Sequence, residues 1–93
     1  MRKRCYPPLS AQILEIQSDL KELKIGIDLA EIVNQQRVNI RTLEGWEVYF
    51  NLEDGVSQQI FNLDIVLKEK ISPEERENLE YVDLRFGNQI YYK

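Results

Sequence analysis

The sequence predicts an α+β fold, a mostly antiparallel sheet with two helices packed on one face. Two observations predict this class. Apolar residues recur every three or four positions in two stretches, and at every second position in five others. The first three alternating stretches are joined by short links, which connect only antiparallel neighbours. An order of helix, three strands, helix and two strands is typical of helices layered on an antiparallel sheet.

The first helix is expected from about residue 11 to residue 24. Its apolar positions fall at spacings of three and four, at Ile13, Ile16, Leu20 and Leu23. Ser10 is a candidate N-cap, and Gly26 follows closely enough to help end the helix. This stretch therefore presents one apolar stripe to a core.

Three short strands are expected to follow the first helix. Apolar residues alternate with other residues over 27–30, 37–42 and 46–52, and the third of these is the clearest strand in the sequence. A polar turn at residues 34–36 separates the first two strands, and Glu44-Gly45 links the next pair. The region is therefore predicted to be a meander.

A second helix is expected over residues 56–71, with Asp54 as its capping residue. Its apolar face comprises Val56, Ile60, Leu63, Leu67 and Ile71. Ser72-Pro73 should stop this helix, because the residue before a proline disfavours the α region. The charged residues 74–80 that follow can form one more helical turn on the surface.

The chain closes with two alternating stretches, residues 81–86 and 89–92. Gly87 stands first in the two-residue link between them, which suits a type II′ hairpin. On the first of these strands, Val82, Leu84 and Phe86 are expected to face the helices. Tyr81, Asp83 and Arg85 are then left on the other side of the sheet.

Length and composition exclude several classes of function. The chain has 93 residues and 11.1 kDa, with 12 Lys and Arg against 16 Asp and Glu, one cysteine and no histidine. Histidine-dependent catalysis, histidine-ligated metals, an internal disulfide and an iron–sulfur cluster are therefore ruled out. A formal charge of −4 disfavours nucleic-acid binding, and no apolar run approaches the roughly 20 residues of a membrane span. Residues 1–8 are interpreted as an irregular lead-in or the boundary of a fragment, and residues 9–93 as one domain.

No catalytic, cofactor-binding or metal-binding constellation is predicted. The dense carboxylates Glu74, Glu75, Glu77 and Glu80 are expected on a solvated face with no apolar pocket to raise a pKa. Cys5 has no neighbouring base to activate it, and each of the four glycines is isolated at a predicted turn. Asp83 is expected to make a local hydrogen bond, or to pair with Arg85 or with a neighbouring strand. We therefore expect no enzymatic activity and no small-molecule substrate.

Aromatic residues gather at the end of the chain. Tyr81, Phe86, Tyr91 and Tyr92 lie within the last thirteen residues. Core packing and ordinary strand composition explain Phe86 and one tyrosine. Because two helices cover only one face of the sheet, Tyr81 and one of the last two tyrosines should stay partly exposed. Tyrosine beside arginine on an open sheet edge is typical of a protein-binding surface.

The terminal residues 81–93, YVDLRFGNQIYYK, resemble the closing strand pair of the bacterial cell-division protein family FtsQ, also called DivIB. That family ends in an aromatic–aliphatic–Asp–Leu–Arg–aromatic strand, a tight turn and a last strand with aromatic residues. The helix, the strand around Trp46-Glu47-Val48-Tyr49-Phe50 and the leucine-rich helix also follow the order of the family's β-domain. The resemblance covers the chain from about Leu9 to Lys93.

The resemblance implies a non-catalytic scaffold domain outside the membrane at the division septum. Family members carry a cytoplasmic tail, a transmembrane helix and a POTRA domain before the β-domain. Because this chain lacks those parts, it is most simply a fragment, and its membrane attachment would come from an upstream anchor. If the chain is instead a complete short protein, membrane anchoring and septal localisation are both in doubt.

The partners implied are an FtsB/DivIC-type protein, which adds a β-strand to the sheet, and an FtsL-type protein held through it. By the motif, Arg85 and Phe86 are the first candidates for this contact. Tyr91 and Tyr92 come next, followed by Tyr81 and Asp83.

One alternative stays open, a small soluble cytoplasmic domain that binds a ligand or regulates another protein. A pocket between sheet and helices lined by Trp46 and Tyr49 would favour it, and so would a last strand that is covered.

Overall fold

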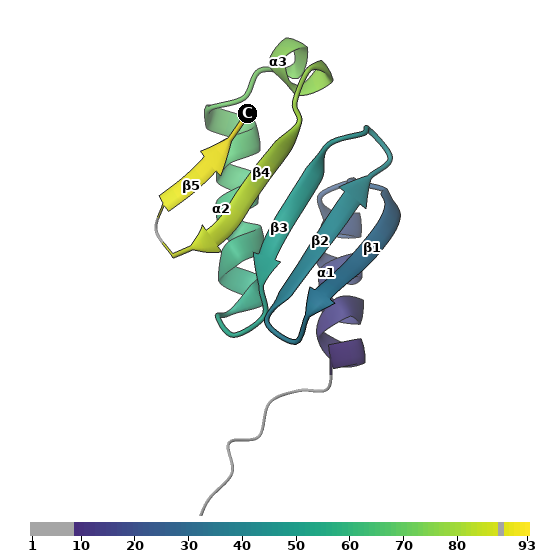
Figure 1. Ribbon diagram of the computed structural model, residues 1–93. Helices are drawn as coiled ribbons and strands as arrows, with labels where there is room; N and C mark the ends of the chain where they lie inside the picture. Colours follow the sequence, from purple (N-terminus) through teal and green to yellow (C-terminus); the bar gives the residue numbers. More distant parts are fainter. Residues whose placement is uncertain (1–8, 88) are drawn as a thin grey trace, which may run out of the picture.

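The computed structural model describes residues 9–87 and 89–93, and Figure 1 shows its architecture. Three helices and five strands follow one another in the order α1 (Leu9–Glu22), β1 (Ile27–Asn34), β2 (Arg37–Thr42), β3 (Glu47–Asn51), α2 (Val56–Glu69), α3 (Pro73–Glu77), β4 (Tyr81–Phe86) and β5 (Gln89–Tyr92). The predicted α+β class is confirmed, and the charged segment after Pro73 forms the short third helix.

The five strands form a single sheet in the order β1-β2-β3-β4-β5. The pairs β1–β2, β2–β3 and β4–β5 are antiparallel, as short links require. Strands β3 and β4 are parallel, because the chain returns through α2 and α3 before it enters β4. Within the described residues, β1 and β5 are therefore the two edges of the sheet.

Helices α1 and α2 both lie behind the sheet as drawn in Figure 1, and the core fills the space between these layers. Alternate residues of the inner strands point into it: Val38, Ile40, Val48, Phe50, Val82 and Leu84 are all buried. The helices contribute Ile16 and Leu20 from α1, and Ile60 and Leu63 from α2. Burying one such side chain contributes about 1.5–3 kcal/mol, so this layer supplies most of the stability.

Helix α1 begins at Leu9, so Ser10 lies inside the helix and is not its N-cap. The helix ends in a Schellman motif centred on Lys24, whose φ of 63° is left-handed. The Ile25 N–H donates to the Leu20 carbonyl at 2.9 Å, and the Lys24 N–H donates to the Lys21 carbonyl at 2.9 Å. Leu20 and Ile25 are both buried, and an apolar pair of this kind accompanies the motif. The left-handed residue is thus Lys24, two positions before the predicted glycine.

Helix α2 is joined to β3 by a buried glutamine. The N-cap of α2 is Gly55, which offers no side-chain cap, so the predicted role of Asp54 is wrong. The Gln59 side chain is buried, accepts a hydrogen bond from the Asn51 N–H at 2.9 Å, and donates one to the Asn51 carbonyl at 2.7 Å. It also donates to the Gly55 carbonyl at 3.3 Å. One amide side chain therefore satisfies backbone groups at the end of β3 and at the start of α2.

The hairpin between β4 and β5 contains Gly87, whose φ of 63° suits a glycine. The predicted type II′ assignment also depends on Asn88, which lies outside the described residues. The predicted lead-in at residues 1–8, including Cys5, lies outside them as well.

Candidate functional site

The face of the sheet opposite the helices, here called the open face, carries polar and aromatic side chains. These residues alternate with the core residues on the same strands, as the pleat of a strand requires. They are Arg37, Asn39 and Arg41 on β2, Glu47, Tyr49 and Asn51 on β3, and Tyr81, Asp83 and Arg85 on β4. Of the six residues assigned to a partner contact from the sequence, Tyr81, Asp83, Arg85 and Tyr91 lie on this face by alternation, and Phe86 reaches it at an irregularity in the β4–β5 pairing.

Arg85 is held in place by Asp83, as predicted. The Arg85 Nε donates to Asp83 Oδ1 at 2.9 Å, and its second guanidinium nitrogen donates to Oδ2 at 2.7 Å. The Arg85 N–H also donates to Oδ1 at 3.1 Å. Burial opposes ionisation of Asp83, but these hydrogen bonds outweigh it and hold its pKa below the usual value. A bidentate pair of this kind orients the guanidinium before any partner arrives.

Two tyrosines from neighbouring strands stack beside Arg85. The rings of Tyr49 and Tyr81 lie 5.4 Å apart between centroids with an interplanar angle of 17°. The Arg85 guanidinium carbon lies 5.7 Å from the centre of the Tyr49 ring. Burial, followed by the Glu47 carboxylate, raises the pKa of Tyr49, so its hydroxyl stays protonated at neutral pH. The stack therefore offers neutral rings and hydrogen-bonding hydroxyls next to a fixed cation.

Arg37 on β2 approaches the same tyrosine from the strand on its other side. Its guanidinium carbon lies 4.8 Å from the centre of the Tyr49 ring, and its Nε donates to Asn39 Oδ1 at 2.9 Å. Arg41 and Arg85 both form salt bridges with carboxylates on the open face, whereas none is found for Arg37 among the described residues. Arg37 therefore presents a positive charge that a partner carboxylate can neutralise.

Phe86 lies outside the core, contrary to the sequence-based expectation. It is 52% exposed, while Val82 and Leu84 on the same strand are buried. The pairing of β4 with β5 shifts in register between Asp83 and Phe86, so that Phe86 lies opposite Gln89. An irregularity of this kind changes the face to which the following side chain points. The core assignment of Phe86 is thus wrong.

The displaced Phe86 extends the cluster to the last strand. Its ring meets the Tyr91 ring edge to face, with centroids 5.5 Å apart, and the Arg85 guanidinium carbon lies 5.1 Å from its centre. The Tyr91 hydroxyl donates to Gln89 Oε1 at 2.7 Å. Tyr91 is 50% exposed, so the Phe86–Tyr91 pair is open to solvent along the edge. We call Arg37, Tyr49, Tyr81, Arg85, Phe86 and Tyr91 the arginine–aromatic cluster.

Tyr92 belongs to the other side of β5. It pairs with the core residue Val82, so it points toward the helix side, where it remains partly exposed. Ile90 packs against the core from the same side. The last strand is thus anchored by Ile90, while Tyr91 and Tyr92 flank its free edge on opposite faces.

The sequence did not indicate Arg37 as a site residue, and it suggested Tyr49 only for the pocket of the alternative function. They lie 32 positions or more before the terminal motif, and they reach it only because β3 pairs in parallel with β4. The alternation along residues 37–42 and 47–51 places both on the polar side of their strands, which is the available sequence signal. Which strand neighbours β4 is decided by the packing of α2 and does not follow from alternation.

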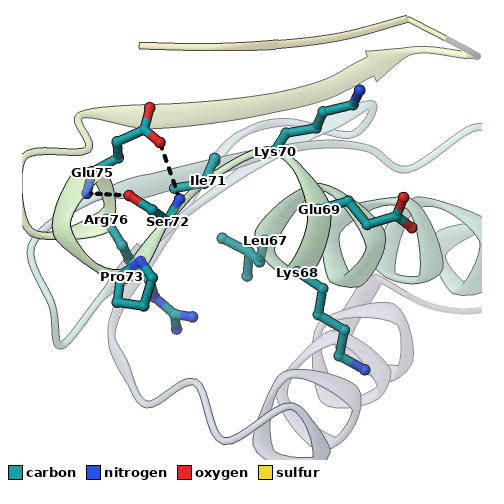
Figure 2. A pocket seen from close by; sticks show the side chains of 9 residues that line it. All are labelled: Leu67, Lys68, Glu69, Lys70, Ile71, Ser72, Pro73, Glu75 and Arg76. Atoms are coloured by element: carbon teal, nitrogen blue, oxygen red, sulfur yellow. Dashed lines mark hydrogen bonds between the residues drawn. The ribbon is translucent and has the colours of Figure 1, made fainter.

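A hollow lies away from this cluster, between the C-terminal end of α2 and α3 (Figure 2). It measures about 530 Å³ and contains Lys68, Glu75 and Arg76 among its lining residues. Arg76 is held by Glu44 through two hydrogen bonds of 2.7 Å, and Lys68 is paired with Asp64. Glu75 and Ser72 form the capping box of α3, drawn as dashed lines in Figure 2. These three charged groups are thus engaged in structural contacts.

Residues 9–87 and 89–93 contain no group of three His, Cys, Asp or Glu side chains that could hold a metal ion. The same residues contain no helix long and apolar enough to cross a membrane. The expected carboxylates Glu74, Glu75, Glu77 and Glu80 are all exposed.

No protein-family model and no curated protein matches this chain.

Proposed function

We propose that this chain is a non-catalytic protein-binding domain that receives an extended segment of a partner along β5. The observation that carries the proposal is the arginine–aromatic cluster beside a free sheet edge. An edge strand offers unpaired backbone groups to an added strand, and adjacent side chains then select the sequence that binds. Tyrosine and arginine are the residues that most often dominate binding energy at protein interfaces.

The geometry of the cluster favours a partner with both acidic and apolar side chains. A carboxylate can reach Arg37, which has no salt bridge among the described residues. Apolar side chains can pack on the exposed rings of Phe86 and Tyr91. The Asp83 pair fixes Arg85 in advance, so little side-chain entropy is lost when the partner docks.

The narrower proposal is that the partner is an FtsB/DivIC-type protein, with an FtsL-type protein held through it. In that case the chain serves as the scaffold β-domain of a cell-division complex, outside the membrane and attached through an upstream anchor. This identity rests on the resemblance of residues 81–93, whereas the partner site itself rests on the contacts of the arginine–aromatic cluster. The alternative of a pocket lined by Trp46 and Tyr49 has no geometric support. Trp46 is fully buried, and Tyr49 lies on the open face.

The test is a calorimetric titration of the chain with a soluble FtsB/DivIC-type ectodomain. Arg85→Glu reverses the fixed charge and should weaken binding by a factor of about 30 or more, as expected for a hot-spot residue. A chain that ends at Gly87 lacks β5 and should not bind. Lys68→Glu on α2 makes the same change of charge far from the cluster and should bind like the original chain. Unchanged affinity in both the Arg85→Glu chain and the shortened chain would overturn the proposal.

A further inference from the structure

The edge of the sheet opposite β5 has a different surface. Strand β1 leaves three large apolar side chains exposed, Leu29 at 58%, Ile32 at 51% and Val33 at 46%. Its pairing with β2 is regular from Leu29 to Ile32 and shifts in register on either side of that stretch. The central four residues therefore form a short straight edge with free backbone groups on the outer side.

A hollow of about 440 Å³, lined by both apolar and polar side chains, runs beside this edge between α1 and β1. Gln17 and Lys21 line it from α1, and Ile27, Asp28, Leu29 and Ala30 line it from β1. Leu14 lies one turn before Gln17 on the same stripe of α1, and it is also exposed. We call the edge of β1 together with this hollow the β1 strip. Its exposed apolar side chains are Leu29, Ile32 and Val33, and its lining also includes polar side chains.

We propose that a second copy of this chain covers the β1 strip, with the two β1 strands paired antiparallel about a two-fold axis at Ala30. A perpendicular two-fold axis requires that residues opposite each other point to the same face. With the two-fold axis at Ala30, the two Ala30 residues lie opposite each other on the helix side, which satisfies this condition. Leu29 then lies opposite the second copy's Glu31 on the open face. On the helix side, Ile32 of each copy then lies over the other's hollow, near Ile27.

Charge complementarity selects this register and this occupant. Arg41 is the β2 neighbour of Leu29, so in the paired sheet it lies in the same cross-strand row as the second copy's Glu31. The Arg41 side chain is half exposed, and its present partner Glu47 leaves it room for a second carboxylate. Centring the axis on Glu31 instead would set two like charges opposite each other, which is destabilising. If the pairing of the two β1 strands slipped by one residue, the helix side of one copy would meet the open face of the other. Ile32 would then no longer lie over the second copy's hollow.

The two-fold arrangement joins two five-stranded sheets through their β1 edges and leaves both β5 edges free at the far ends. Two copies would then offer two separate arginine–aromatic clusters, and a bivalent partner would gain avidity from them. The self-association itself does not depend on the proposed partner site.

Sedimentation equilibrium of the whole chain, from about 10 µM to about 1 mM, tests the proposal. The mass should rise from 11.1 kDa toward twice that value as concentration increases. Ile32→Lys should raise the dimer dissociation constant at least tenfold. Phe61→Lys, which changes a similarly exposed apolar residue on α2, should leave it unchanged. Leu29→Lys serves as a second edge variant should Ile32→Lys fail to fold by circular dichroism.

A charge exchange tests the register. Glu31→Arg and Arg41→Glu should each weaken the dimer, and the double variant should recover most of the loss. A constant mass of 11.1 kDa up to about 1 mM would overturn the proposal. Equal effects of Ile32→Lys and Phe61→Lys would overturn it too. A double variant no better than either single one would contradict pairing about Ala30.

Discussion

Strand β4 presents two different surfaces within six residues. On the helix side, Val82 and Leu84 are fully enclosed by apolar neighbours. On the open side, Asp83 holds Arg85 beside Tyr49. The comparison teaches that one strand can serve two tasks, since alternate side chains either stabilise the fold or belong to the proposed recognition surface. Changes on the helix side should therefore alter stability, and changes on the open side should alter binding.

The largest effect is expected from Leu84→Ala on the helix side. Removing most of a buried leucine side chain leaves a cavity and costs about 2–5 kcal/mol of unfolding free energy. Urea denaturation followed by circular dichroism measures this loss. Below the unfolding transition, the folded fraction should still bind the partner with nearly the original affinity. A loss below about 1 kcal/mol would mean that the core is packed otherwise than described.

Gln59→Leu should cost less, about 1–3 kcal/mol, because it removes both side-chain hydrogen bonds to the Asn51 backbone. The Asn51 N–H loses its bond to Gln59, and the Asn51 carbonyl keeps only the 3.4 Å bond from the Asp54 N–H. The same urea experiment measures it. Gln58→Leu provides a matched control one position earlier, since Gln58 is exposed and its side chain bonds only to Asn62 among the described residues. If both variants lose the same stability, Gln59 does not join α2 to β3.

Lowering the pH tests how much ionised Asp83, on the open side of β4, contributes to stability. Its pKa in the folded chain lies below the usual value, so its ionised form stabilises the fold above the unfolded-state pKa of about 3.9. This contribution should fall as the pH drops from about 5 toward the folded-state pKa and below it. Hydrogen bonds from Arg76 lower the pKa of Glu44 and add a change in the same direction. The urea concentration at the unfolding midpoint should decline less with falling pH for Asp83→Asn than for the original chain. Equal declines in the two chains would contradict a stabilising role for ionised Asp83.

The smallest expected effect is a gain in stability. Lys24 adopts a left-handed conformation in which a side chain is strained, and glycine has no such penalty. Lys24→Gly should therefore raise the unfolding free energy by about 0.5–1 kcal/mol without changing partner affinity. Lys21→Gly, inside the last turn of α1, should instead lower stability by a similar amount. Thermal unfolding of the two variants shows whether each one gains or loses stability.

Much of the fold follows from local sequence patterns. The bounds of β4 and β5 agree with the alternation of residues 81–86 and 89–92, and the three-stranded meander follows from short polar links. Helix ends were less predictable. Asp54 carries a capping side chain, yet the backbone places Gly55 at the N-cap.

The candidate site was predictable only in part. Arg85 lies on the open face, as the alternation of residues 81–86 predicted, and is half-buried there. The alternation left open which of Tyr91 and Tyr92 is exposed, and both are. Phe86 was misplaced, because one register shift in a hairpin reverses the face of a side chain without changing the alternation of the sequence. Arg37 was missed, because its approach to the cluster depends on the parallel pairing of β3 with β4. Long-range pairings of this kind result from packing across the whole sheet.

The most direct test of the account is an NMR titration of the chain with an FtsB/DivIC-type ectodomain, followed by amide chemical shifts. The account predicts that the largest changes fall on β5, on β4 around Arg85 and on the open-face residues Arg37 and Tyr49. Amides in the outer turns of α1 and α2 should move little. Changes concentrated on the helices, or a saturated complex in which β5 is unaffected, would contradict the claim that the open side of this sheet is the recognition surface.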